Sequence, residues 1–433
     1  MNSLAGIPLL LLAMSLCLFA AALPPAQATP LTLEAALATV DSSHPELLQA
    51  KAGRDSAQAD QQMVRASQDA SLDLEGTLRS GHPTAGGQGF TPDNSLRLTG
   101  RKTLYDFGRS SNAELAAQYE LNAREQDLTT ARDNLRLEIM TRYFDVLLAD
   151  MQYMVDNEMM SVDYVSYDQG KDKLEKGMIS SVDLAELESI YREALLKRNA
   201  SAQRQRITRA LLANAMNRPG NLPGELEDPK LAGNQAALPD YETLLPVMLE
   251  NNPRLQAQHE MLAASLKRLE SLRASKNPIL AAEVQAADYS RTASTRDSLS
   301  AGVILSWPLY EGSRVDSRIE REMARFNELQ ASTEKLKMEL IQALLETCLN
   351  INLLQDSTRN AANKYSEYRD QQLERSRGLY ELEFKSNLGT SMVGTAEAKM
   401  KVRNVEYQLA LGFARLEALL GKPLSQSGVK QGE

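Results

Sequence analysis

Two long stretches of the chain carry an unbroken helical pattern of apolar and polar residues. Residues 109–176 and 314–380 contain no proline, and each stretch has a single glycine near its end. In the first stretch, apolar side chains recur at steps of three and four, the spacing of a coiled-coil seam: Leu137, Met140, Phe144, Leu147, Met151 and Met154. A helix of about 68 residues extends on the order of 100 Å. Such helices cannot fold back into a compact globule, so we expect them to pack in a bundle or to build a long wall.

A second long helix follows each of these stretches. The pattern predicts helices over about 109–176 and 181–217, and again over about 314–382 and 386–421. Gly177 provides the first turn, because a glycine after a helix readily adopts the left-handed conformation. Ser180 or Ser181 then caps the next helix, and the helix dipole favours an acid such as Asp183 in its first turn. One face of this helix is apolar and is formed by Leu184, Leu187, Tyr191 and Leu195.

Four shorter stretches alternate between apolar and polar residues. They predict strands over about 71–80 and 95–105, and over about 279–290 and 298–310. Alternation over about ten residues is the length that a tilted strand needs to cross a bilayer. A half-buried hairpin of a soluble protein has the same pattern, so the strands by themselves leave both interpretations open.

The chain contains the same order of elements twice. "RKTLYDFGRS" at 101–110 is echoed by "LSWPLYEGSR" at 305–314, and "HPEL" at 44–47 by "NPRL" at 252–255. Each half opens with a helix that a proline interrupts. We therefore expect two structural repeats, over 29–217 and 241–424, joined by a Pro- and Gly-rich linker or equatorial segment over 218–240 and followed by a tail over 425–433.

The first 28 residues read as a secretory signal peptide. An apolar run is followed by Ala26 and Ala28, which make a small-residue cleavage site, so the mature chain is expected to begin at Thr29. The segment before the apolar run has no Lys or Arg, and Leu16 before Cys17 is not the small residue of a lipoprotein signal. Beyond residue 28 no apolar run is long enough for a transmembrane helix.

Composition and motifs argue against nucleic acid binding and against enzyme activity. The net charge of −9, without a lysine- or arginine-rich run, disfavours nucleic acid as a partner. The three histidines are isolated, and the chain has no metal-ligand spacing, phosphate-binding loop or nucleophile motif. We therefore expect no enzyme activity and name no catalytic, cofactor-binding or metal-binding residue.

The set of motifs, in this order, resembles the TolC-like outer membrane factor family. The similarity runs from about Leu31 to Leu424 and rests on four kinds of landmark: "LTLEAALATVDSSHPEL" at the start, "LYDFGR" and "LYEGSR" after the strands, "LEKGMISSVDLAELE" between the first long helices, and "EALLGKP" at the end. The resemblance implies a mixed fold with four transmembrane β-strands and long coiled-coil helices per protomer. It also implies a homotrimer that forms a 12-stranded barrel in the outer membrane and an α-helical tunnel in the periplasm.

The resemblance also assigns roles to residues. Adaptor docking falls on Gly177, Met178 and Ser180, and a periplasmic gate falls on Tyr380, Lys385, Asp183 and Glu186. The second tip departs from the family, because positions where some members carry pore-facing aspartates are Gly389 and Met392. The simpler interpretation makes the first set a plain helix turn and the second set solvated helix ends, whose exposed ion pairs contribute roughly 0–1 kcal/mol.

The strand ends carry the other assigned residues. Tyr105, Gly108, Tyr310 and Gly312 mark the junction between barrel and tunnel, and Trp307 suits the aromatic belt of a membrane interface. The function so implied is an exit duct of a tripartite efflux pump or a type I secretion system. Its partners would be outer membrane lipid, a periplasmic adaptor (membrane fusion) protein and an inner-membrane ABC or proton-driven transporter. A soluble periplasmic coiled-coil adaptor or scaffold is the alternative.

Overall fold

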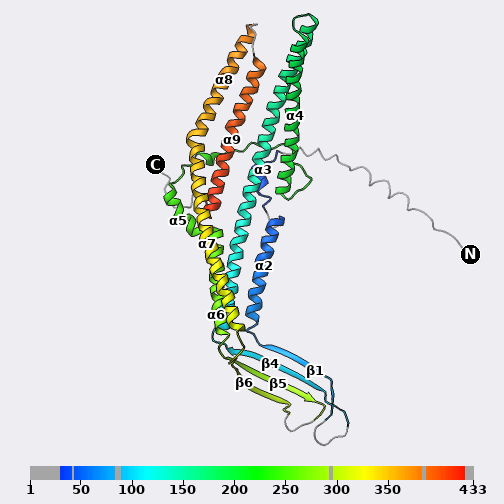
Figure 1. Ribbon diagram of the computed structural model, residues 1–433, viewed down its shortest axis with the longest axis vertical. Coiled ribbons are helices and arrows are strands. Elements are labelled where there is room, and N and C mark those ends of the chain that lie inside the picture. The colour runs from blue at the N-terminus through cyan, green and yellow to red at the C-terminus, as the bar shows by residue number, and fades with distance from the viewer. Residues whose placement is uncertain (1–29, 41–42, 83–88, 292–295, 383–386, 425–433) are drawn as a thin grey trace, which may run out of the picture.

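The computed structural model describes residues 30–40, 43–82, 89–291, 296–382 and 387–424 of the chain. The molecule is elongated, with one β-sheet at one end and two pairs of long helices pointing to the other (Figure 1). The signal peptide over 1–28, the tail over 425–433 and Lys385 lie outside the described residues.

The two halves of the chain build matching elements. The first half contains α1 (Leu33–Leu37), α2 (Pro45–Ala66), β1 (Ser71–Thr77), β4 (Ser95–Tyr105), α3 (Arg109–Glu175) and α4 (Ser181–Ala215). The second contains α5 (Tyr241–Asn251), α6 (Pro253–Ala274), β5 (Ile279–Tyr289), β6 (Leu299–Ser306), α7 (Arg314–Asn352), η2 (Leu353–Thr358), α8 (Arg359–Glu381) and α9 (Leu388–Leu420). Three short elements complete the description: β2 (Ser80–Gly81), β3 (Thr91–Pro92) and the 3₁₀ turn η1 (Ala232–Gln235).

The helices before the strands show the repeat most directly. Helices α2 and α6 each have 22 residues and begin with a proline, whose missing N–H costs nothing at this position. His44 caps α2 by accepting a hydrogen bond from the Glu46 N–H at 3.3 Å, and Asn252 caps α6 by accepting from the Leu255 N–H at 3.1 Å. His44 therefore has a structural role.

The four main strands form one antiparallel sheet in the order β1-β4-β5-β6. The hairpins of the two halves join through β4 and β5, where Leu98 lies opposite Ala286. The first strand ends at Thr77 rather than at about 80, and Ser80–Gly81 pair with Thr91–Pro92 in a separate small sheet. The last strand ends at Ser306 rather than at about 310, because Pro308 has no N–H to donate to the ladder.

The long helix α3 has 67 residues and runs from the sheet to the far tip (Figure 1). Helix α4 returns beside it and ends at Ala215, slightly before the expected 217, because Asn217 takes the left-handed conformation with φ 57°. The Arg218 N–H then bonds the Ala213 carbonyl at 2.8 Å, which closes the end of the helix.

The second long helix is continuous in path but not in type. Between α7 and α8 the six residues of η2 form a wider π-helical turn, which sequence periodicity does not anticipate. Gln355 in this turn donates hydrogen bonds to the carbonyls of Asn234 and Ala236 at 3.1 and 3.0 Å. The wider turn thus fastens the long helix to the segment between the two halves.

Two buried clusters hold the helices together. In one, the rings of Phe144 (α3) and Tyr407 (α9) stack with centroids 4.6 Å apart and an angle of 5°. In the other, α5, α7 and α9 bury Leu244, Leu344 and Leu409 completely. Of the apolar stripe expected on α3, Phe144 and Leu147 are buried, Leu137, Met140 and Met151 are half-buried, and Met154 is exposed.

Candidate functional site

The sheet has one apolar and one polar face. On the apolar face Leu74 lies opposite Leu98, and Val284 lies opposite Ala301. Its large side chains are exposed, including Leu72 at 72% and Leu299 at 70%. The chain alone thus presents an apolar surface that water does not favour.

The polar face carries charges that pair across the strands. Arg101 of β4 forms an ion pair with Glu283 of β5, and Arg97 of β4 lies 3.9 Å from Glu75 of β1. An apolar face opposite a face of paired charges is the arrangement of a strand wall between lipid and water.

Both edges of the sheet are open within the described residues. Strand β1 pairs only with β4, and β6 pairs only with β5. The outer backbone groups of β1 and β6 therefore need partners beyond this sheet, and lipid offers none.

The junction residues lie where the strands become helices. Gly108, with φ 84°, precedes α3, and Gly312, with φ 65°, precedes α7. The Asp106 carboxylate accepts the Ser110 N–H at 2.9 Å and so satisfies one free donor of the first helical turn. Tyr105 is 57% exposed and Tyr310 is 91% exposed. Two aromatic rings thus face outward at the level where sheet meets helix.

Trp307 lies just beyond β6 at the same level. Its side chain is 59% exposed, and its Nε1–H donates to the Lys276 carbonyl at 3.3 Å. The indole is therefore held at one end and open along its ring, the condition of an aromatic residue at a membrane interface.

The first helical tip is a tight turn built from local hydrogen bonds. Gly177 has φ 70°, and the Met178 N–H bonds the Lys173 carbonyl at 2.8 Å across the end of α3. Ser180 and Asp183 cap α4 reciprocally: the Ser180 hydroxyl accepts from the Asp183 N–H, and the Asp183 carboxylate accepts from the Ser180 N–H at 2.8 Å. These bonds hold the pKa of Asp183 below its ordinary value.

Apolar side chains are exposed at both tips. Met178 and Val182 are 68% and 75% exposed at the first tip, and Tyr380 and Leu382 are 65% and 69% exposed at the second. The sequence reading selected Met178 and Tyr380 but missed Val182 and Leu382. The turn residues next to Val182 and Leu382 in the sequence were the signal that could have identified them.

The second tip pair is held by small residues. The hydroxyls of Ser376 (α8) and Ser391 (α9) lie 2.7 Å apart and are buried. A side chain at Gly389 would lie 2.6 Å from the Val162 methyl of α3, so this glycine lets the second pair approach the first closely. Gly389 therefore serves a packing contact between α9 and α3.

Three of the proposed gate residues are described, and they lie on different helix pairs. Asp183 and Glu186 are exposed on α4, and Tyr380 is exposed on α8. Among the described residues, no hydrogen bond or ion pair connects Tyr380 to either carboxylate. The Asp183 carboxylate instead binds within its own helix cap.

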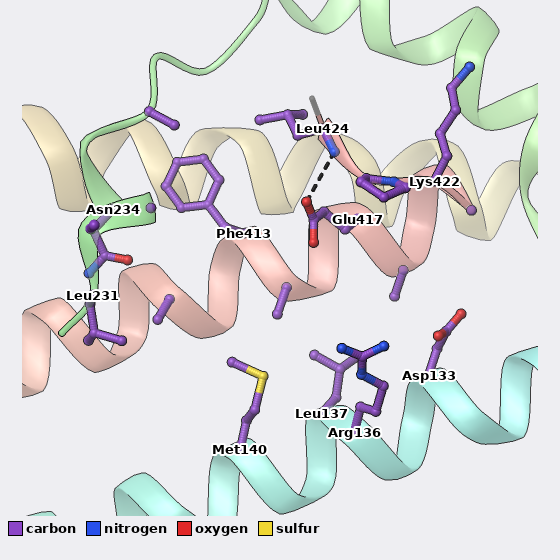
Figure 2. A pocket seen from close by; sticks show the side chains of 18 of the residues that line it. Asp133, Arg136, Leu137, Met140, Leu231, Asn234, Phe413, Glu417, Lys422 and Leu424 are labelled. Atoms are coloured by element: carbon purple, nitrogen blue, oxygen red, sulfur yellow. Dashed lines mark hydrogen bonds between the residues drawn. The ribbon is translucent and has the colours of Figure 1, made fainter. Parts of the chain in front are cut away.

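A groove of about 800 Å³ lies at the middle of the molecule, between α3, α9 and the segment over 230–236 (Figure 2). Met140 and Leu137 point from α3 toward α9, whereas Glu417 lies on the far side of α9 and accepts the Leu424 N–H at 3.0 Å (Figure 2). Burial raises the pKa of Asp133 on its wall, although Arg136 and Arg132 oppose the shift.

A polar network at this level was not anticipated from the sequence. Arg359 of α8 binds Glu406 of α9 through two hydrogen bonds of 2.7 and 2.8 Å, and the Asn234 amide donates to the same carboxylate at 2.8 Å. Burial acts to raise the pKa of Glu406, but the bonds from Arg359 and Asn234 leave it below its ordinary value. The linker is therefore tied to the long helices rather than being a free connection.

The described part of the chain lacks two features. No group of three or more His, Cys, Asp or Glu residues is arranged to hold a metal ion there. Over the same residues, no helix combines the length and the apolar character that crossing a membrane requires.

Exposed apolar strands joined to helices of on the order of 100 Å define a class of protein: tunnel-like channels with a helical wall. The sequence matches the family described as "Outer membrane efflux protein" over residues 36–218 and 244–422. The chain belongs to the outer membrane efflux protein family, whose matched members and structural neighbours are channels rather than enzymes. The TolC-like resemblance and the fold class expected from the sequence are confirmed.

Solved structures with the same fold have low sequence identity. The outer membrane protein VceC from Vibrio cholerae has a TM-score of 0.72 and 16% identity, covering 90% of this chain and 96% of that one. The CmeC outer membrane channel of Campylobacter jejuni has a TM-score of 0.72 and 13% identity, covering 93% and 87%. The open state of the MtrE outer membrane channel of Neisseria gonorrhoeae has a TM-score of 0.71 and 15% identity, covering 90% and 89%. No match was found among the curated protein sequences.

Proposed function

We propose that this chain is the outer membrane exit duct of a tripartite efflux pump or of a type I secretion system. The observation that carries the proposal is the amphipathic sheet with two open edges, continuous with helices of on the order of 100 Å. The strands cross the outer membrane, and the helices conduct substrate through the periplasm. The signal peptide over 1–28 would direct export and be removed from the mature chain.

The sheet supports a homotrimer. A closed barrel of about eight strands has an interior just wide enough for its side chains. Four strands would leave no room for them, so the sheet of one chain cannot close on itself. Three copies, each adding β1 to the β6 of its neighbour, make a 12-stranded barrel whose edges are all paired. This closure places the paired charges of the polar face toward water and the leucines toward lipid.

The tips support docking of a periplasmic adaptor. Gly177, Met178 and Ser180 form the first tip, and the exposed side chains of Val182 and Leu382 add apolar area there and at the second tip. An adaptor contacts these tips and connects them to an inner-membrane ABC or proton-driven transporter, which selects the cargo.

The gate is assigned to Tyr380, Lys385, Asp183 and Glu186, acting between neighbouring helix pairs. We expect the single-channel conductance of Asp183→Ala and Lys385→Ala to rise above that of the wild type, because each removes a charge that closes the tip. Ser180→Ala is the matched control, since it removes the hydroxyl half of the same helix cap but keeps the carboxylate. If conductance is unchanged in both charge variants, the gate assignment is wrong.

Cell fractionation with an unboiled gel tests the duct itself. The proposal predicts an SDS-resistant trimer in the outer membrane fraction. The alternative, a soluble periplasmic adaptor or scaffold, predicts a soluble chain in the periplasmic fraction. That alternative leaves the exposed leucine face of the sheet without a function.

A further inference from the structure

Lys102 lies on the apolar face of the sheet. In β4 this face is formed by alternate residues, and a side chain at Gly100 would lie 3.7 Å from the Leu72 methyl of the same face. Lys102 follows two residues later, opposite Ala282, which in turn lies opposite Val303. The ammonium thus belongs to a surface of leucine, alanine and valine side chains.

The charges of the two faces differ in their partners. On the polar face, Arg97 and Arg101 lie near Glu75 and Glu283. Lys102 is exposed, and its side chain makes no hydrogen bond or ion pair with any described residue. An unpaired cation on an apolar surface is costly in lipid, so this position needs an anion from outside the chain.

The position along the strand indicates where that anion lies. Lys102 is three residues before the end of β4 at Tyr105, or roughly 10 Å at 3.3 Å per residue. Trp307 lies just beyond β6, four residues past Val303, and its indole is held by the Lys276 carbonyl. A lysine stem extends along apolar surface and carries its ammonium from Lys102 toward this interface, where headgroups lie.

We infer that Lys102 binds the phosphate of an anionic phospholipid in the periplasmic leaflet of the outer membrane. The ammonium pairs with the phosphate, and the acyl chains cover the leucine face. This site rests on the proposed function, because it requires the apolar face to lie in a membrane. It adds one lipid class and one headgroup site to that function.

Native mass spectrometry of the purified full-length protein tests the site. The protein is equilibrated in micelles with phosphatidylglycerol, with phosphatidylcholine, or with inorganic phosphate alone. We expect Lys102→Gln to lower retention of phosphatidylglycerol about fivefold, equivalent to ~1 kcal/mol, with Lys102→Arg restoring it. Lys335→Gln is the matched control, because Lys335 is an exposed lysine of α7 whose side chain is 76% exposed.

Each outcome decides a specific point. Equal retention of phosphatidylglycerol by the wild type and Lys102→Gln overturns the site, as does an equal loss in Lys335→Gln. Displacement of the lipid by millimolar inorganic phosphate shows a free-anion site and also overturns it. Channel conductance is recorded from the same samples. If Lys102→Gln retains as much lipid as the wild type and both conduct normally, the site is wrong but the duct stands. If the wild type never inserts into a bilayer, both the site and the duct are wrong.

Discussion

At the scale of single residues, Gly421 ends α9 in a conformation that a side chain does not tolerate. Its φ is 68°, and a Cβ there would lie 2.1 Å from the Asn251 carbonyl oxygen. We expect Gly421→Ala to destabilise the protein by more than ~1 kcal/mol, lowering the melting temperature in detergent. Gly233→Ala is the control, because its Cβ would meet nothing within 4 Å. Equal melting temperatures for both variants contradict this prediction.

Asp183 makes the first tip sensitive to strong acid. Its pKa is lowered by the Ser180 N–H and hydroxyl, so the folded state binds the proton less readily than the unfolded state, whose pKa is about 3.8. The cap is therefore fully present above pH 3.8 and is lost as the pH falls through the lower folded value. We expect amide protection at residues 181–185, corrected for intrinsic exchange, to fall below pH 3.8 in the wild type. Asp183→Ala should lack this step, and a step at higher pH contradicts the assignment.

Sequence reasoning found the residues whose roles are local. Gly177, Ser180 and Gly108 act through turn and cap geometry, which a few neighbouring residues determine. It missed Val182 and Lys102, because exposure at a tip and the face of a strand depend on register with other segments. It had no access to the partners of Glu406, which lie far away along the chain.

At the scale of elements, the Arg359–Glu406 pair holds α8, α9 and the linker together. Both side chains are about four-fifths buried, and the two hydrogen bonds of the pair are short. We expect Glu406→Ala to lower the free energy of unfolding by about 1.5–3 kcal/mol, since it removes the acceptor of both Arg359 bonds and leaves the Asn234 amide only the backbone carbonyl of residue 406. Denaturant titration measures the change. Glu193→Ala, which breaks an exposed pair with Lys197, should cost less than about 0.5 kcal/mol; similar losses in both argue against the network.

Helices and strands could be predicted from the sequence where a single hydrophobic period continues along the whole element. Heptad spacing and the absence of proline predicted α3, and alternation predicted the four main strands. The π-helical turn over Leu353–Thr358 escaped, because its side-chain pattern differs from a helix by only one residue. The small sheet of β2 and β3 escaped as well, since two-residue strands carry no period.

At the scale of the whole molecule, the two faces of the sheet should respond differently to a new charge. Val284 faces the leucine side of β5, and its neighbour Gln285 faces the polar side. We expect Val284→Arg to cost about 2–4 kcal/mol in a bilayer and to abolish SDS-resistant oligomers, whereas Gln285→Arg keeps them. Unboiled gels after reconstitution report both results. If both variants keep the SDS-resistant oligomers, or both lose them, the assignment of the two faces is wrong.

The central claim is that copies of this chain close their sheets into a water-filled channel. Planar-bilayer recording of the purified full-length protein tests it most directly. The account predicts discrete conductance steps from the wild type. The absence of steps from a wild-type sample that inserts as SDS-resistant trimers would contradict the account.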